Sequence, residues 1–403
     1  MTKRTTSQNL MLVGVVLAVL LSGCTASEPS ETATDAPDAT PAAALDRALA
    51  ELVAMPGGPP GVISIIQIDD VRTVHTAGVA IAGESAPPEP DDAMRVASVA
   101  KAFSGATALA LVDRGVLSLD DTIGSLLPAE PEGWAPVTLR QLLNHTSGLP
   151  DFTTSARFQE AAGASLTVAP PPEELLAFAA DEPLNFVPGT QYRYSNSDNI
   201  AVALMIQEAT GRPYTDVLQE LVLDPLGLSA TSLPAGTDMP TPTFHGYDLD
   251  ESGAPEDITN ALAAGWAWAS GGVVSTPTDL NTFIRGYVGG ELFDAQTQAE
   301  QTALFIPGGE SGPPGPGENS ASLSLFRYET SCGVVYGHTG NTVGYTQFAV
   351  ASPDGTRSAT VSMNLGRNEN STGQDLAVLH ALQRAEAKAI CAAMSDIEAS
   401  GGQ

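Results

Sequence analysis

The alternation of apolar and polar positions places strand-like runs near both ends of the chain and helix-like runs between them. Residues 43–54 repeat apolar positions with a helical period, and the β-branched runs 62–68 and 71–82 flank Asp69-Asp70, which is typical of a hairpin. Four more strands are expected at 323–328, 333–336, 345–351 and 358–364, followed by a helix over 375–394.

The middle of the chain has mainly helical patterns. Residues 102–112 are almost wholly apolar with small side chains, so a helix over 95–114 is expected to be buried on most sides. Further helices are predicted at 139–143, 171–180, 200–210, 213–222 and 278–288.

These patterns predict an α+β fold. An antiparallel sheet is assembled from both ends of the sequence and flanked by the N- and C-terminal helices, and an all-helical lobe is inserted between its parts. We expect one domain over 44–395, with a sheet lobe at about 44–116 and 267–395 and a helical lobe at about 117–266.

For two segments the sequence allows either a role at the functional site or a purely structural role. Residues 306–321 are rich in Pro and Gly and predict a loop. This loop either borders a functional site or is a mobile surface insertion, and its composition favours the second. Trp266 and Trp268 either line a cleft or pack in the core, and core packing is favoured.

The first residues follow the pattern of an export signal. Lys3 and Arg4 precede an apolar run at 10–21, and Leu21-Ser22-Gly23-Cys24 is similar to a bacterial lipobox. We therefore expect a signal peptide over 1–23 and lipidation of Cys24, with an ordinary signal peptide as the alternative. Residues 24–43 have the composition of a disordered tether. The expected location is the outer face of the cell membrane, as a lipoprotein.

The cysteine count and the net charge restrict the covalent links and the partners that this chain can have. With Cys24 lipidated, Cys332 and Cys391 remain, and in an exported protein we expect a disulfide between them; two buried free thiols are the alternative. Loss of residues 1–23 moves the formal net charge from −30 to −32. Because such a surface repels phosphate backbones, nucleic acid is excluded as a partner.

The stretch Ser98-Val99-Ala100-Lys101 carries the strongest chemical signal. Lysine occurs only at positions 3, 101 and 388, and arginine supplies the other formal cations. Lysine can lose its proton whereas arginine cannot. On a helix, Ser98 and Lys101 share one face, where a proton-sharing amine activates the hydroxyl as a nucleophile.

Two further motifs supply what acyl transfer needs besides a nucleophile. In Tyr194-Ser195-Asn196, Tyr194 can transfer a proton and Asn196 can hold Lys101 or a substrate amide. His338-Thr339-Gly340 follows a predicted strand and supplies contacts to the substrate. The backbone amides of Ser98 and Asn341 are candidates for an oxyanion hole. Arg327 either binds a substrate carboxylate or faces solvent.

The remaining histidines do not form a metal-binding pattern. His75, His245 and His380 lack ligand spacing, and a structural role is favoured for His145. We therefore expect neither a metal nor another cofactor.

At these motifs the chain resembles the serine β-lactamase and penicillin-binding protein superfamily, in particular class C β-lactamases and actinobacterial D-alanyl-D-alanine carboxypeptidases. The resemblance runs from about residue 62 to 391. It includes the segments 95–101 and 139–150, Tyr194-Ser195-Asn196, Ser331-Cys332-Gly333 and 336–340. It implies a β-lactamase/transpeptidase-like fold with a site between the two lobes, Ser98 as the acylated nucleophile, and Lys101 with Tyr194 as the proton-transfer pair.

The third motif departs from the class C pattern, because His338 stands where a lysine occurs in those enzymes. This departure favours the carboxypeptidase branch or esterases of the family. The preferred interpretation is a D-alanyl-D-alanine carboxypeptidase acting on peptidoglycan stem peptides. A β-lactamase or esterase of the same family is the alternative, although no glutamate motif of the class A deacylation type is found. A non-enzymatic module that binds cell-wall peptide or β-lactam is a further alternative. If an imidazolium at His338 binds a substrate carboxylate, KM should rise with pH through the histidine pKa.

Overall fold

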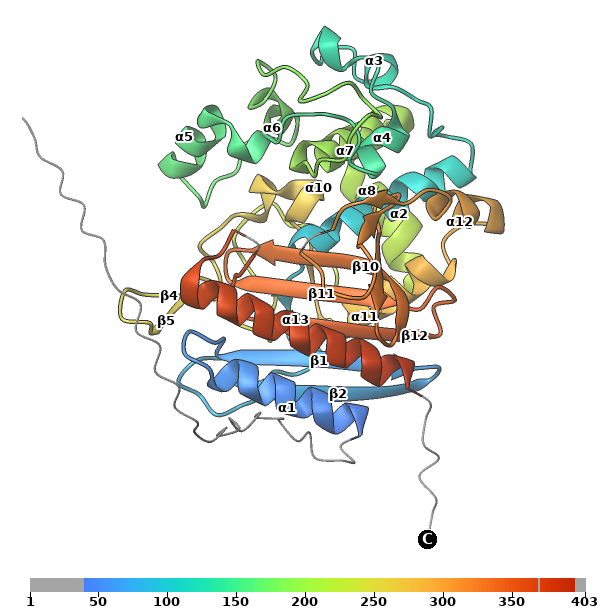
Figure 1. Cartoon of the computed structure of the whole chain (residues 1–403). Coiled ribbons are helices and arrows are strands. Elements are labelled where there is room, and N and C mark those ends of the chain that lie inside the picture. Colours follow the sequence, from blue (N-terminus) through green and yellow to red (C-terminus); the bar gives the residue numbers. More distant parts are fainter. Residues whose placement is uncertain (1–39, 310, 369, 396–403) are drawn as a thin grey trace, which may run out of the picture. The chain divides into compact units, whose positions relative to one another are not determined.

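The computed structural model describes residues 40–309, 311–368 and 370–395. Its main feature is an eight-stranded antiparallel sheet with the order β2-β1-β12-β11-β10-β9-β8-β7 (Figure 1). The N-terminal hairpin of β1 (Gly61–Ile68) and β2 (Val71–Gly78) pairs with the last strand, β12 (Arg357–Met363). The sheet is thus assembled from both ends of the sequence, as predicted. The predicted signal peptide and Cys24 lie outside the described residues.

One of the late strands is longer than the sequence pattern indicates. β10 (Gly333–Thr342) extends six residues beyond the predicted run, so the His338 motif lies inside this strand instead of after it. Pairing with β11 along its length explains the extension. The other strands of the sheet are β7 (Ile306–Pro307), β8 (Ser320–Ala321), β9 (Phe326–Thr330) and β11 (Tyr345–Ala351).

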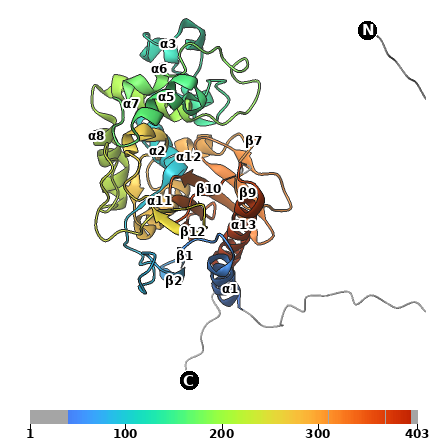
Figure 2. The ribbon, with the colours of Figure 1, turned by 90° about the vertical axis from the view of Figure 1, so that its left-hand side faces the viewer.

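Helices cover both faces of the sheet (Figures 1 and 2). One face packs on α1 (Pro41–Ala54) and α13 (Gly373–Met394), and the other packs on α2 (Ala100–Asp113) and α11 (Pro277–Gly289). In β11, Phe348 and Val350 belong to the apolar cluster on the α13 side, whereas Ala349 belongs to the cluster on the α2 side. Alternating side chains of a buried strand thereby join two cores.

The first helix begins earlier than predicted. The Thr40 side chain accepts a hydrogen bond from the Ala43 amide, and Pro41 occupies the first turn, where its missing N–H costs nothing. Residues 41–43, assigned to the tether from composition, are therefore helical.

The helical lobe is inserted in the sequence between the early and late parts of the sheet lobe, and its helices, drawn in green, lie above the sheet in Figure 1. The chain re-enters the sheet lobe before the predicted boundary at residue 266. Thr243 forms an isolated bridge with Ala93, and Tyr247 forms one with Leu365. A small hairpin of β4 (Tyr247–Leu249) and β5 (Pro255–Asp257) follows there. The helices of the lobe are α3 (Ile123–Leu126), α4 (Leu139–Leu143), α5 (Ala156–Ala164), α6 (Glu173–Ala177), α7 (Asn196–Thr210), α8 (Tyr214–Leu218) and α9 (Asp224–Leu226).

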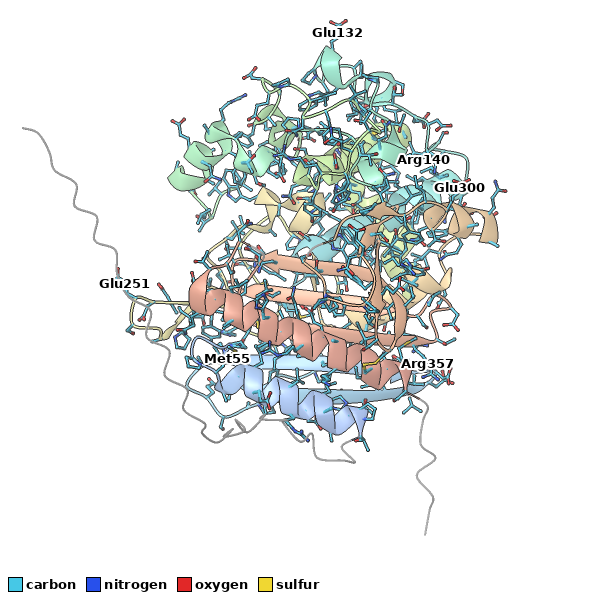
Figure 3. All side chains as sticks on the ribbon, viewed as in Figure 1. Met55, Glu132, Arg140, Glu251, Glu300 and Arg357 are labelled. Atoms are coloured by element: carbon cyan, nitrogen blue, oxygen red, sulfur yellow. A yellow bond between two sulfur atoms is a disulfide. The ribbon has the colours of Figure 1, made fainter. Side chains whose placement is uncertain are left out.

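Ion pairs and caps connect elements that are distant in sequence (Figure 3). Arg140 of α4 pairs with Glu300 of α12 (Ala295–Gln301), with 3.1 Å between Nη1 and Oε2. Arg357 at the start of β12 donates from Nη1 to the carbonyl of Ala393 at 3.2 Å, near the end of α13. Because both partners of the Arg140 pair are partly exposed, that pair fixes geometry more than it adds stability.

The predicted disulfide is present: Cys332, in the turn between β9 and β10, is bonded to Cys391 of α13. The bond closes a segment with a sequence separation of 59 residues. In the chain-entropy model a loop of this length restricts the unfolded state by about 4 kcal/mol. Replacing both cysteines with serine should therefore lower the free energy of unfolding by up to about that amount, measured by urea denaturation. An unchanged midpoint would contradict this.

Candidate active site

The predicted helix over 95–114 is interrupted at the nucleophile. Arg95 belongs to the short strand β3 (Met94–Arg95), a 3-10 turn spans η1 (Ala97–Val99), and α2 begins at Ala100. Ala97 has a φ of 51°, which is unfavourable for a residue with a Cβ atom. The turn places Ser98 at the N-terminus of α2, where its backbone N–H has no acceptor within the helix.

Lys101 lies directly beneath Ser98, as the Ser-x-x-Lys spacing predicts. Its Nζ is 3.3 Å from Ser98 Oγ, 2.7 Å from Asn196 Oδ1 and 2.6 Å from the carbonyl oxygen of Ser270, at the end of α10 (Trp268–Gly271). The side chain is fully buried. Burial lowers the pKa of Lys101 to about 7, because desolvation outweighs the attraction of the Asp151 and Asp198 charges.

The two fixed acceptors determine what the neutral amine can do. The Ser270 carbonyl and Asn196 Oδ1 only accept, so they take two N–H bonds of Lys101. The remaining position of Nζ faces the Ser98 hydroxyl, where a lone pair can receive its proton. The geometry thus supports general-base activation of Ser98.

Asp151 orients Asn196 and was missed by the sequence analysis. Its Oδ2 accepts from the backbone amide of Asn196 at 3.0 Å and from Nδ2 at 2.9 Å. These contacts turn Asn196 Oδ1 towards Lys101. Asp151 directly follows the quoted segment 139–150, but sequence alone gave no sign that its carboxylate lines the pocket. The Ser270 carbonyl was missed as well, because a backbone acceptor has no sequence signature.

Tyr194 stands beside the same amine. Lys101 Nζ lies 4.8 Å from the centre of the Tyr194 ring, and the His145 ring lies 4.5 Å from it on another side. His145 Nδ1 is 2.7 Å from Asp198 Oδ2 in the core. Burial raises the pKa of Asp198 and lowers that of His145 to about 3, so the His145 imidazole is neutral at physiological pH. His145 therefore supports Tyr194 structurally, in agreement with the prediction.

The edge of β10 supplies the other side of the site. β10 pairs with β9 only as far as Gly337, and hairpin pairs at Gly333–Thr330 and Thr342–Tyr345 fix the phase of its hydrogen bonds. Because the backbone groups of successive residues alternate between the two sides of a strand, the N–H and C=O groups of Thr339 and Asn341 point away from β11. They lie on the edge of β10 that β9 leaves unpaired after Gly337. A Cβ atom built on Gly340 would lie 3.1 Å from the Ser98 nitrogen. The edge therefore lies against the Ser98 turn, as the predicted oxyanion pair of Ser98 and Asn341 requires.

These residues open into one pocket of about 430 Å³. Ser98, Tyr194, Asn196, Thr339, Gly340 and Asn341 all line it, so the structure brings together the predicted nucleophile, proton-transfer and binding residues. Gly309 and Ser311 of the Pro/Gly-rich loop also line it, and Ser311 Oγ is 2.6 Å from Thr339 Oγ1. The favoured interpretation of this loop as a surface insertion is therefore wrong, because it forms a wall of the site.

His338 does not have the charge that the sequence analysis considered. Its side chain is 2% exposed, and its Nδ1 donates to the carbonyl of Thr339. The edge of its ring meets Phe326 at a centroid distance of 4.9 Å. Burial lowers the pKa of His338 to about 3, with Lys101 and His145 acting in the same direction. The imidazole is therefore neutral, and the imidazolium on which the sequence-based KM prediction is conditional does not form at neutral pH.

A histidine whose pKa lies near 3 should not titrate between pH 5 and 8. The carbon and nitrogen chemical shifts of the His338 ring should stay constant across that interval. We expect the same constancy of KM as far as His338 contributes to it. The measurement is a long-range proton–nitrogen NMR titration, with His338→Gln used to assign the signals. A titration of the His338 ring shifts between pH 5 and 8 would contradict this and show that an imidazolium forms in that range.

Arg327 does not line the pocket. Its Nη1 pairs with Glu329 Oε2 at 3.0 Å, so its guanidinium is engaged within β9 and not in the Ser98 pocket. Arg367, which the sequence analysis did not single out, lines the pocket and is 8% exposed. Trp266 packs on Phe158 and is 5% exposed, so its predicted core role is confirmed. Trp268 is 6% exposed and packs on Tyr214.

The described residues contain neither a metal-binding cluster nor a membrane-spanning helix. No group of His, Cys, Asp and Glu side chains in the described ranges is arranged to hold a metal ion. Among the same residues, no helix is long and apolar enough to cross a membrane.

A family model described as Beta-lactamase matches residues 45–383. The chain belongs to this family. It is 26% identical over 303 residues to the D-alanyl-D-alanine-carboxypeptidase/endopeptidase AmpH of Escherichia coli, covering 74% of each chain. It is 30% identical over 206 residues to a D-aminopeptidase of Cereibacter sphaeroides, covering 51% of this chain and 39% of that protein.

A solved structure agrees with this assignment. The D-stereospecific amidohydrolase of a Streptomyces species superposes with a TM-score of 0.72 at 29% sequence identity, covering 83% of this chain and 97% of its own. The α+β fold, with its antiparallel sheet and helical lobe, is therefore that of the Beta-lactamase family. Together with the family match, it makes this chain a serine-type hydrolase.

Proposed function

We propose that this Beta-lactamase family hydrolase is an exported D-alanyl-D-alanine carboxypeptidase that acts on peptidoglycan stem peptides through a Ser98 acyl-enzyme. The observation that carries the proposal is the fully buried Lys101, whose amine lies 3.3 Å from Ser98 Oγ and whose pKa is lowered to about 7. A base poised near neutrality can activate serine without a metal.

The free edge of β10 supports a peptide as the substrate. The backbone groups of Thr339 and Asn341 can pair with an extended chain, and the Ser98 amide completes an oxyanion hole with Asn341. AmpH and the Streptomyces amidohydrolase, named for action on D-residues, support D-stereochemistry next to the scissile bond. Lipidation at Cys24 would hold the enzyme beside the cell wall.

A second candidate is a hydrolase of D-amino-acid amides or N-terminal D-residues. The neutral His338 favours it, because a carboxypeptidase must bind a terminal carboxylate and this position supplies no charge. The D-aminopeptidase relative points the same way.

A substrate panel separates these candidates. The purified domain should be incubated with a peptide ending in D-Ala-D-Ala, its C-terminal amide, the D-Ala-L-Ala diastereomer, a cephalosporin and a short-chain ester. The carboxypeptidase proposal expects release of free D-alanine from the first peptide, with much less from the diastereomer. Faster cleavage of the amide would favour the second candidate. Ester or cephalosporin turnover without peptide cleavage would overturn both.

A further inference from the structure

The pocket that contains Ser98 continues around the edge of β10 to the C-terminal helix. Ser98 precedes α2 on one face of the sheet, whereas Glu386 belongs to α13 on the other face, and both line the same pocket. We call this extension the Glu386 subsite. Its lining consists of Phe326, Leu379 and Leu382, with Gly309, Ser311 and Thr339 beside them and Glu386 among them.

The loop wall of the subsite is attached to α13. Gln383 Nε2 donates to the carbonyl of Gly312 at 3.2 Å, and Ser311 bonds Thr339 of β10. The loop therefore closes the space between the strand edge and the helix. The apolar part of the lining fits an aliphatic chain.

Glu386 is the unexplained group in this space. Its side chain is 2% exposed, and Oε2 is fully buried without a hydrogen-bond partner in the described structure. Leaving a buried polar atom unpaired is costly. Burial alone raises the pKa of Glu386 to about 8, so its carboxyl is mainly protonated and neutral at pH 7.

The cationic side chain that lines this pocket is already engaged. Arg367 lines the same pocket, but its Nη2 pairs with Asp375 Oδ1 at 3.0 Å and its Nη1 donates to the carbonyl of Gly366 at 2.6 Å. Tyr328 is a titratable neighbour of Glu386: burial first, and then Glu386, raises the pKa of its phenol, so Tyr328 is neutral. A ligand is the remaining source of a positive charge.

We propose that the Glu386 subsite binds a primary amine at the end of an aliphatic side chain of the substrate. When the ammonium binds, the Glu386 carboxyl releases its proton to solvent, and the resulting carboxylate accepts hydrogen bonds from the ammonium. Leu379, Leu382 and Phe326 pack on the methylene groups of the ligand. This deepens the proposed function and rests on it, because it gives the peptide substrate a diamino acid. The ammonium lowers the pKa of Glu386 by its opposite charge, and the hydrogen bonds between the two ions are stronger than those between neutral groups.

The test measures binding separately from turnover. Three peptides of the form acetyl-Xaa-D-Ala-D-Ala, with Xaa as lysine, norleucine or 6-hydroxynorleucine, are titrated by calorimetry into the Ser98→Ala enzyme, which holds substrate without cleaving it. We expect the lysine peptide to bind about 10-fold to 100-fold more tightly than the norleucine peptide, as for a hydrogen bond to a charged group. In Ser98→Ala combined with Glu386→Gln, the two affinities should become equal.

Several controls make the result decisive. Glu256→Gln removes the same charge from an exposed strand and should leave the preference intact. Equal affinities for lysine and norleucine in the Ser98→Ala enzyme would overturn the subsite without recourse to the Glu386 variant, even if that variant failed to fold. Equally tight binding of the hydroxynorleucine peptide would overturn the requirement for a charge. Labelling of wild-type Ser98 by a fluorescent penicillin reports separately on the proposed function.

Discussion

Replacement of Ser98 with alanine should abolish acyl-enzyme formation and lower kcat by roughly 10⁴-fold to 10⁶-fold, as expected when a catalytic nucleophile is removed. In the described site, only the Ser98 hydroxyl lies at the N-terminal end of a helix, has a base at 3.3 Å and is adjacent to the edge of β10. Without Oγ, the oxyanion donors and Lys101 remain in place but no covalent bond can form. The measurement is intact mass after incubation with a β-lactam, together with peptide turnover.

A matched variant controls for this change. Ser229→Ala removes a hydroxyl from an exposed position and should retain wild-type labelling and rate. Unfolding curves of the two variants should coincide with that of the wild type to within about 1 kcal/mol. Labelling that persists in Ser98→Ala would place the nucleophile elsewhere and remove the proposed mechanism.

Replacement of Lys101 with arginine should lower kcat/KM by about 1,000-fold, within the range for loss of a general base. Arginine keeps the positive charge but cannot give it up, whereas the pKa of Lys101 is lowered to about 7. In the wild type, kcat/KM should therefore rise with pH through an apparent pKa near 7, as the ammonium becomes the neutral amine. The variant should lack this limb.

Lys388→Arg is the matched control, because it changes the other lysine of the described chain at an exposed position of α13. It should retain both the rate and the pH limb. Arginine at position 101 is bulkier than lysine, so thermal unfolding and penicillin binding must be compared as well. A Lys101→Arg enzyme with more than a tenth of the activity and an unchanged limb would exclude Lys101 as the base.

The sequence by itself determined the features that depend on local spacing. Ser98 and Lys101 stand three residues apart and meet whether the segment is one helix or a 3-10 turn followed by a helix. Cysteine count predicted the bond between Cys332 and Cys391, and hydrophobic periodicity predicted a sheet assembled from both chain ends.

Only the tertiary structure decided the charge and direction of the side chains around that pair. Burial makes His338 neutral, brings the pKa of Lys101 near 7 and leaves Glu386 unpartnered. Strand pairing extends β10 through the third motif, and packing turns Arg327 to Glu329 while it brings Arg367 to the pocket. The physical reason is that desolvation and hydrogen-bond geometry depend on residues far apart in the chain, and local patterns do not specify which of them meet.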